Sequence, residues 1–139
     1  MRLEPIHKTP RDLRVPPHLV DYAREAASFS WAAARREIDG LPGGRGLNIA
    51  HEAVDRHAAG ARGARDAIRW HPRRGPPQVY SYAALAALTS RFANLLGGLR
   101  IARGERVFSL LGRVPELYAA ALGSLKYGAV FSPLFSAFG

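Results

Sequence analysis

The sequence contains no cysteine among its 139 residues. This absence excludes a disulfide framework and any metal site built on thiolates. A long apolar run is also missing, because the most apolar stretch, 114–135, is interrupted by Glu116 and Lys126 and contains two prolines. Such a stretch cannot supply the roughly 20 apolar residues of a membrane-spanning helix, and the first thirty residues contain no apolar signal-peptide core. We therefore expect a cytoplasmic protein with no membrane partner.

Lysine is scarce as well, since only Lys8 and Lys126 accompany the arginines that give the chain its net charge of +9. A strongly basic balance can mark a nucleic-acid partner. Here, however, the arginines are dispersed, with one loose concentration between 56 and 74 in which only Trp70 could stack on a base. Nucleic-acid sites usually present a clustered basic face. We expect solvated arginines and no specific nucleic-acid partner.

The first third of the chain favours helices after an extended arm. Prolines and charges interrupt residues 1–17, whereas apolar residues recur at intervals of three and four over 18–37 and predict a helix. The glycine- and proline-rich stretch 39–46 ends it. Asn48 is a plausible N-cap for a second helix over 49–59. The apolar positions expected to be buried on that second helix are Ile49, Ala53 and Val54.

The middle of the chain predicts a hairpin followed by an amphipathic helix. Short β-prone segments at 67–71 and 79–82 flank the turn sequence PRRGPP, which is typical of a β-hairpin. The segment 82–99 then carries apolar residues on one predicted helix face. The members of this stripe are Leu85, Leu88, Phe92, Leu95 and Leu99.

The last third alternates strand, helix and strand. The apolar run at 107–111 predicts a strand covered on both faces, and Pro115 suits the first turn of the helix that follows. Gly128 is expected to cap this helix before a strand over 129–135. Two strands joined by a helix should be parallel. The residues expected on the buried side of the helix are Leu117, Ala121, Leu122 and Leu125.

Three groups of residues are candidates for functional sites. The glycines at 43–46 could cradle a phosphate, but no strand precedes them and no Lys-Ser/Thr pair follows, so a connecting loop is favoured. His51 and His57 would point about 240° apart on a helix and could not share a metal, and His71 has no ligand-like neighbour. The carboxylates do not form a recognisable acid–base pair. We predict no catalytic residue and no metal site.

Several segments together resemble a known family. LNIAHEAVDRHA at 47–58 resembles the start of AMP-forming acetyl-CoA synthetases, and Trp31 matches a tryptophan usual upstream of it. SRFANLLGGL at 90–99 and the segment 104–139 resemble the elements that follow in the same order. The resemblance covers about residues 20–139, and it places the chain in the adenylate-forming acyl-CoA ligase superfamily.

The resemblance implies a two-step reaction. A carboxylate and ATP, with Mg²⁺, give an acyl-adenylate and pyrophosphate, and CoA then displaces AMP to form the thioester. The family's phosphate loop, adenine and ribose contacts and late lysine have no counterpart within the 139 residues. We therefore expect these residues to bind none of the cofactors tightly. One functional position carries over: Ser136 and Ala137 match the segment that lies near CoA, the alternative being a strand end that packs against a neighbour.

The resemblance also implies an organisation and a function. Residues 1–46 would be an N-terminal extension of the acetyl-CoA synthetase type, and 47–139 the truncated start of the large AMP-binding domain. The fold class would be α/β: a helical N-terminal segment, a hairpin and the opening βαβ of a larger sheet. The expected activity is acetate–CoA ligase, with acetate as the small carboxylate partner. The alternatives are another short- or medium-chain acyl-CoA ligase, and a free-standing basic binding module.

Overall fold

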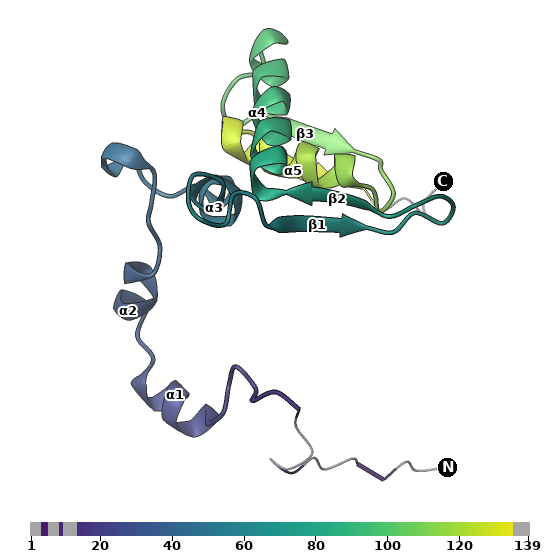
Figure 1. Cartoon of the computed structure of the whole chain (residues 1–139). Coiled ribbons are helices and arrows are strands. Elements are labelled where there is room, and N and C mark those ends of the chain that lie inside the picture. Colours follow the sequence, from purple (N-terminus) through teal and green to yellow (C-terminus); the bar gives the residue numbers. More distant parts are fainter. Residues whose placement is uncertain (1–3, 6–8, 10–13, 135–139) are drawn as a thin grey trace. The chain divides into compact units, whose positions relative to one another are not determined.

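The computed structural model describes residues 4–5, 9 and 14–134, and it divides the chain into two units, 1–38 and 39–139 (Figure 1). Each unit is described by itself. Within the described residues, no helix has the length and apolar character needed to cross a membrane.

The described part of the first unit contains two short helices. Helix α1 spans Tyr22–Ser28 and α2 spans Trp31–Arg36. The single helix predicted over 18–37 is therefore wrong. Phe29 and Ser30 are extended, and the Ser30 hydroxyl accepts a hydrogen bond from the Ala33 N–H at 3.1 Å. This cap begins a new helix where an apolar periodicity alone suggested continuity.

The second unit begins with a 3₁₀ turn, η2 (Pro42–Gly44), and a helix over 49–58. The helix includes a π-helical stretch, η3 (His51–Asp55), and ends in α3 (Arg56–Ala58). The predicted cap is confirmed: the Asn48 side-chain oxygen accepts from the N–H of Ala50 at 2.9 Å. The predicted buried face is only partly correct. Ala50 and Val54 are buried, whereas Ile49 and Ala53 are exposed.

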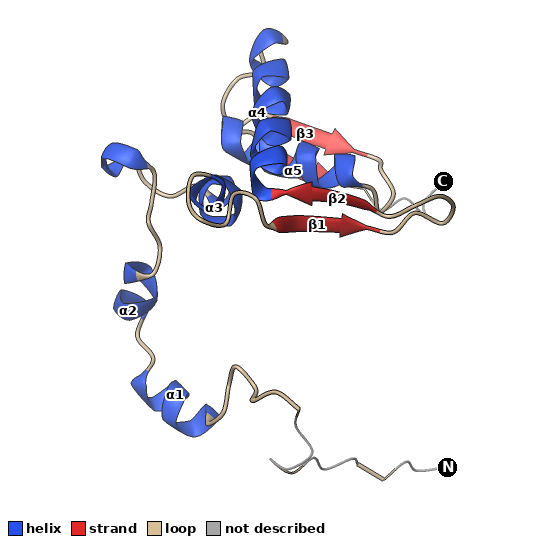
Figure 2. Cartoon of the chain, in the orientation of Figure 1, coloured by secondary structure: helices blue, strands red, loops and turns tan. Residues whose placement is uncertain are grey.

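The hairpin is confirmed, with each strand beginning and ending one residue before the predicted range. Strand β1 (Asp66–Trp70) pairs antiparallel with β2 (Gln78–Ser81), and an irregularity in the register lies between Asp66 and Ile68. The Ser81 hydroxyl accepts from the Ala84 N–H at 3.2 Å and so caps helix α4 (Tyr82–Gly98) directly after β2. Figure 2 shows β1 and β2 side by side, with α4 rising from the end of β2.

Helix α4 exists where it was predicted, but its buried face is rotated. The predicted stripe included Leu95 and Leu99, which are 54% and 63% exposed. Leu85 of the predicted stripe is buried, and the other buried residues of the helix, Thr89, Ala93 and Leu96, lie outside that stripe. The small side chains of Thr89 and Ala93 allow a neighbouring helix to approach α4 closely. This close packing outweighs the burial of a larger leucine.

The strand–helix–strand unit is confirmed. Strand β3 (Arg106–Ser109) pairs in parallel with β4 (Val130–Pro133), and α5 (Pro115–Tyr127) connects them. Gly128 has a φ of 94°, a left-handed value that suits glycine, and it ends α5. The predicted buried residues of α5 are only half-buried. Its fully buried positions are Pro115, Ala120, Gly123 and Ser124.

The parallel pair is not covered on both faces within the second unit. Side chains alternate between exposed and half-buried along β3, and Phe108 is 62% exposed. Leu110, Val130 and Leu134 are exposed as well. An apolar parallel pair of this kind normally packs between helices on both faces. The prediction of a strand covered on both faces is therefore wrong for the residues that the structure describes.

Helices α4 and α5 pack most closely at Gly123. A Cβ atom at this position would come within 2.8 Å of the Phe92 Cβ and within 2.8 Å of the Thr89 carbonyl oxygen. Real Cβ atoms do not approach neighbours at such distances, so a side chain at 123 would push the two helices apart.

We therefore expect Gly123→Ala to lower the free energy of unfolding by about 1–2 kcal/mol, because overpacking outweighs the better helix propensity of alanine. Gly98→Ala is the matched control, since no atom lies within 4 Å of a Cβ built there. That variant should be neutral or stabilising by up to about 1 kcal/mol. Urea unfolding followed by circular dichroism measures both. Equal effects of the two substitutions would contradict the proposed contact.

Candidate functional site

The two residues predicted to lie near CoA, Ser136 and Ala137, fall outside the described residues. The structure does describe the strand that leads to them. The Leu134 N–H donates to the Ser109 carbonyl at 2.7 Å, so the chain still follows β3 just beyond the end of β4. In parallel sheets, ligands commonly bind beyond the carboxyl ends of the strands. The predicted contact therefore follows the carboxyl end of the parallel pair, and it stays a prediction.

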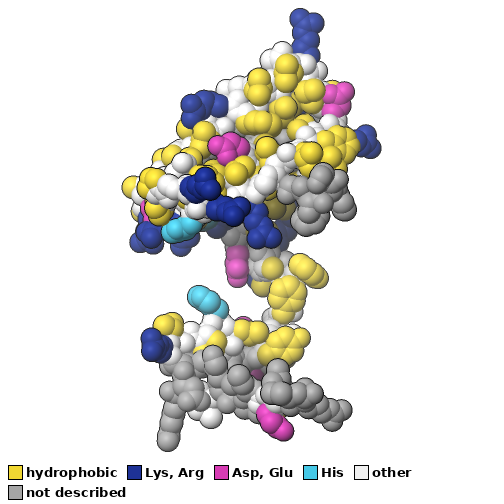
Figure 3. Space-filling model, turned by 90° about the vertical axis from the view of Figure 1, so that its right-hand side faces the viewer, with side chains coloured by type: hydrophobic (Ala, Val, Ile, Leu, Met, Phe, Trp, Pro, Cys, Tyr) yellow, Lys and Arg dark blue, Asp and Glu magenta, His cyan; other side chains and the backbone are white. Residues whose placement is uncertain are grey.

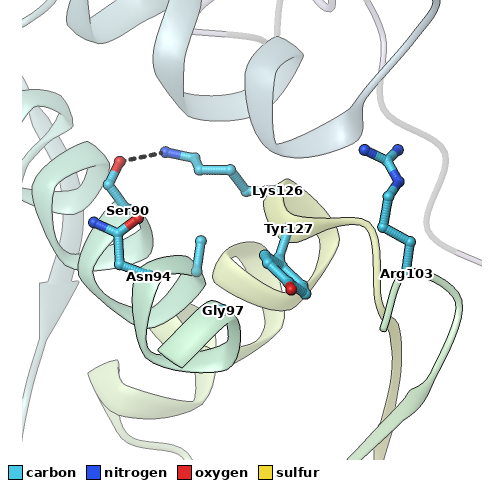
Figure 4. Close-up of a pocket in the computed structure, with 7 residues that line it drawn as sticks. Ser90, Asn94, Gly97, Arg103, Lys126 and Tyr127 are labelled. Atoms are coloured by element: carbon cyan, nitrogen blue, oxygen red, sulfur yellow. Dashed lines mark hydrogen bonds between the residues drawn. The ribbon is translucent and has the colours of Figure 1, made fainter. Parts of the chain in front are cut away.

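The densest polar cluster of the described residues surrounds Lys126, in the last turn of α5. Its Nζ lies 2.7 Å from Asp55 Oδ1, 2.8 Å from Thr89 Oγ1 and 3.1 Å from Ser90 Oγ. The Ala86 carbonyl oxygen is 3.4 Å away. Figure 4 shows the Lys126 side chain directed toward Ser90 across the space between the helices. One ammonium carried by α5 thus contacts two other elements, η3 and α4.

A second contact holds the same turn of α5. The Asn48 side-chain amide donates to the Leu125 carbonyl at 2.8 Å, while its oxygen caps the helix over 49–58. Helix C-termini leave carbonyl groups without intrahelical partners, and Asn48 satisfies one of them. The helix over 49–58 is therefore attached to the end of α5 by both Asn48 and Asp55.

The chemistry of the Lys126 cluster is structural. The ammonium donates to a carboxylate, two hydroxyls and a carbonyl, and its side chain is only 18% exposed. A protonated lysine held in this way has no lone pair for nucleophilic attack and no free donor for a substrate. Oxygens arranged around a single point suit the compact ammonium better than the planar fork of arginine. This explains a lysine here in a chain whose other described basic side chains are arginine.

A cavity of about 590 Å³ lies beside this cluster (Figure 4). Its lining includes Asn94 and Gly97 of α4, Tyr127 of α5 and Arg103. The Tyr127 hydroxyl donates to the Ile101 carbonyl at 2.6 Å. Both helices end here, and helix C-termini carry partial negative charge. The Arg103 guanidinium, which lies against Gly128, offsets that charge. Tyr127 therefore anchors the end of α5, and Arg103 offsets the charge of the helix ends that border the cavity.

A third polar group surrounds Glu52 in η3. Its carboxylate accepts hydrogen bonds from the Gly40 N–H at 2.7 Å, the Asp39 N–H at 3.3 Å and the Arg56 guanidinium at 2.6 Å. Partial burial raises the pKa of Glu52, but these three hydrogen bonds and the nearby positive charge lower it more. The resulting pKa lies below the usual value of 4.5. Glu52 therefore anchors the segment before the helix as an ionised carboxylate.

The remaining sequence candidates do not form sites. The His57 ring packs edge-on against Tyr82 with centroids 5.2 Å apart. In the part of the chain that the structure describes, no three histidine or acidic side chains gather where a metal could bind. The glycine-rich segment folds as η2 and is closed by a hydrogen bond from the Leu41 N–H to the Gly46 carbonyl. It connects elements, as the sequence favoured.

Sequence reasoning missed the Lys126 cluster. Asp55 lies 71 residues from Lys126 and Thr89 lies 37 residues away, so no local pattern links them. The available signal was compositional: a lone lysine within a mostly apolar segment of a chain whose other basic side chains are mainly arginine. That signal marks an unusual position but does not identify its partners.

We expect Lys126→Met to lower the free energy of unfolding by about 2 kcal/mol, because it leaves the partly buried Asp55 carboxylate without its partner. The remaining exposure of both side chains keeps the loss below that of a fully buried pair. Lys126→Arg should lose less, since the charge remains. Arg91→Met, at an exposed position of α4, is the control. If Lys126→Met cost no more than this control in urea unfolding, the cluster would not stabilise the fold.

A second prediction concerns Glu52 and pH. Because its pKa is lower in the folded than in the unfolded chain, Glu52 stabilises the fold above about pH 4.5. That contribution is lost as the pH falls through the folded-state pKa. Glu52→Gln should therefore be less stable than the unmodified chain at pH 7, and the difference should shrink below pH 4.5. A difference in unfolding free energy that stays constant from pH 7 to pH 3 would contradict this role.

Comparison with known proteins assigns this arrangement to a family. A family model described as AMP-binding enzyme matches residues 54–139. Acetyl-coenzyme A synthetase of Bacillus subtilis is 34% identical over 122 residues, which cover 87% of this chain and 21% of that protein. 3-Hydroxypropionyl-coenzyme A synthetase of Metallosphaera sedula is 33% identical over 113 residues, covering 78% of this chain and 17% of that protein.

A solved structure agrees with the sequence relatives. The crystal structure of Brucella canis acyl-CoA synthetase superposes with a TM-score of 0.75 at 34% identity, covering 85% of this chain and 21% of that one. This chain thus spans about a fifth of the length of these relatives. Since the family model covers more than half of the sequence, the chain belongs to the AMP-binding enzyme family, among the adenylate-forming acyl-CoA ligases.

Proposed function

We propose that these residues are part of an AMP-forming acetate–CoA ligase. ATP and acetate would give acetyl-adenylate and pyrophosphate, and CoA would then displace AMP to form acetyl-CoA. Residues 1–46 would be an N-terminal extension, and 47–139 would open the large AMP-binding domain. The observation that carries the proposal is the β3–α5–β4 unit. This unit lies within residues 54–139, which match the family model, and the fold of the chain is similar to that of an acyl-CoA synthetase.

The described residues would contribute scaffold rather than chemistry. The Lys126 and Asn48 contacts hold the end of α5, and β4 begins four residues after Lys126. The Gly104 N–H donates to the Gly128 carbonyl at 2.8 Å, which ties the turn before β3 to the start of β4. The position and register of β4 therefore depend on this anchored helix end. A strand fixed in this way would present Ser136 and Ala137 at a defined place relative to CoA.

ATP, Mg²⁺ and CoA would be the cofactors of the complete ligase. The family's phosphate loop has no counterpart in these 139 residues. The described residues also hold no cluster of acidic or histidine side chains suited to a divalent cation. They lack the groups that would hold the reacting phosphates and Mg²⁺ for adenylation, so no step of that reaction is assigned to them.

Acetate is the favoured acid because the relatives that cover most of this chain bear the name acetyl-coenzyme A synthetase. One of them, from Mycobacterium tuberculosis, is 33% identical over 130 residues. The second candidate is another short- or medium-chain acid. It is favoured by the comparable identity to 3-hydroxypropionyl-coenzyme A synthetases, of which that from Sulfurisphaera tokodaii is 35% identical over 114 residues.

A rival from another class is a free-standing basic binding module that performs no catalysis. The sequence of the gene beyond the codon for Gly139 discriminates the two. A continuing reading frame that encodes a phosphate loop supports the ligase, whereas a stop codon at that point, with independent expression of the chain, supports the module.

The proposed activity predicts opposite results for two polypeptides. The product of the complete reading frame should catalyse acetate-dependent exchange between ATP and pyrophosphate and form acetyl-CoA. The isolated 139-residue chain should show no exchange, because it lacks the groups that stabilise charge on the transferring phosphates.

Isotope exchange with labelled pyrophosphate measures the activity of both polypeptides. Propionate, 3-hydroxypropionate and butyrate are tested beside acetate. Exchange by the isolated chain above a protein-free control would contradict the scaffold role. A complete product that prefers another acid would replace acetate as the substrate, and a complete product inactive with every acid would favour the binding module.

A further inference from the structure

A second cavity lies far from the Lys126 cluster in the sequence, between β1 and the first turns of α5. Its volume is about 380 Å³, within the range usual for small-molecule sites. Two aromatic and two arginine residues line it, together with three smaller apolar residues. The lining residues are Ala67, Ile68, Arg69, Trp70, Arg113, Pro115 and Tyr118. We call this cavity the Trp70 groove.

The aromatic side chains of the groove are placed to contact a flat ring. The Trp70 indole N–H donates to the Arg113 carbonyl at 2.9 Å, which fixes the indole against the segment before α5. Its N–H is thereby satisfied, and Trp70 is among the residues that line the groove. Tyr118, one turn into α5, is 50% exposed. Nucleobases stack on such side chains, and this stacking contributes to their affinity for proteins.

The charge of the groove is positive. The charge of Arg69 is neutralised by Asp66, whose Oδ2 lies 2.6 Å from the Arg69 Nη2. The Arg113 side chain makes no ion pair or hydrogen bond with the described residues, so its guanidinium is available to a ligand. The turn that follows β1 adds exposed Arg73 and Arg74. Figure 3 views the molecule from the side on which this hairpin turn lies, and arginine or lysine side chains gather on that face.

The first turn of α5 carries charge of both signs. Its N-cap, Val114, offers no side-chain acceptor to the free N–H groups of the helix. Helix N-termini carry partial positive charge. Glu116 follows Pro115 in this turn but does not line the groove.

We propose that the Trp70 groove binds a ring-bearing anion of the nucleotide class, with the ring against Trp70 and Tyr118 and the phosphate on Arg113. A guanidinium suits phosphate because it donates two parallel hydrogen bonds. The inference does not depend on the acetate–CoA ligase proposal, since none of these side chains has a part in it.

Tryptophan fluorescence tests the groove directly, because the chain contains only Trp31 and Trp70. Trp31 is 82% exposed and lies in the other unit, so Trp31→Phe leaves Trp70 as the sole reporter without disturbing the second unit. Titration of this variant with ADP should change the Trp70 emission saturably. Adenosine, ribose 5-phosphate and inorganic phosphate separate the contributions of ring and phosphate, and each should bind at least about 10-fold more weakly than ADP.

Two substitutions locate the site. Arg113→Gln should weaken ADP binding about 10-fold or more, since it removes a charge-assisted hydrogen bond. Arg91→Gln is the matched control: it removes an equal charge from an exposed position of α4 outside the groove, and it should leave binding unchanged. Tyr118→Ala should weaken ADP and adenosine but not inorganic phosphate.

Equilibrium dialysis of the unmodified chain with labelled ADP measures the dissociation constant for ADP without any substitution. No saturable binding in dialysis would overturn the proposal. So would equal weakening by Arg113→Gln and Arg91→Gln, which would indicate diffuse attraction to a basic surface. Binding of inorganic phosphate as tight as that of ADP would remove the ring from the assignment and contradict the proposed class.

Discussion

One ammonium group, that of Lys126, links three helices of the second unit. The Nζ of Lys126 is close to oxygen atoms from η3 and α4, and its own backbone lies in the last turn of α5. A partly buried charge is costly unless it is paired and fully hydrogen-bonded. This requirement fixes the distances between three helices at once. The apolar contacts around Val54, Leu85 and Leu96 then fill the space that the cluster leaves.

The helix crossing at Gly123 and the Lys126 cluster act together. Both lie on α5, three residues apart, so they are close to one turn from each other. Gly123 allows α5 to approach Thr89 and Phe92, and Thr89 supplies one of the hydroxyls that Lys126 needs. A bulkier residue at 123 would separate the helices and lengthen that hydrogen bond. The close packing at Gly123 and the hydrogen bond of Lys126 to Thr89 therefore constrain the same pair of helices. Their contributions to stability are not independent.

The chemistry attributed to the family does not reside in these contacts. Lys126, Asn48 and Glu52 are held in hydrogen bonds within the scaffold, whereas a reactive site needs groups that are free to exchange protons or partners. The Trp70 groove differs in this respect, because the Arg113 guanidinium has no described partner and two aromatic rings border an open space.

The sequence alone determined the order and type of most elements in the second unit, because these follow from local signals. The Asn48 cap, the proline at the start of α5 and the glycine at its end act within one turn of the chain. The faces that become buried were not decided locally. Leu95 belongs to the apolar stripe yet is exposed, since the packing of α5 selects the face of α4 that carries Thr89 and Ala93. The partners of Lys126 lie 36 to 71 residues away along the chain, and only the tertiary structure brings them together.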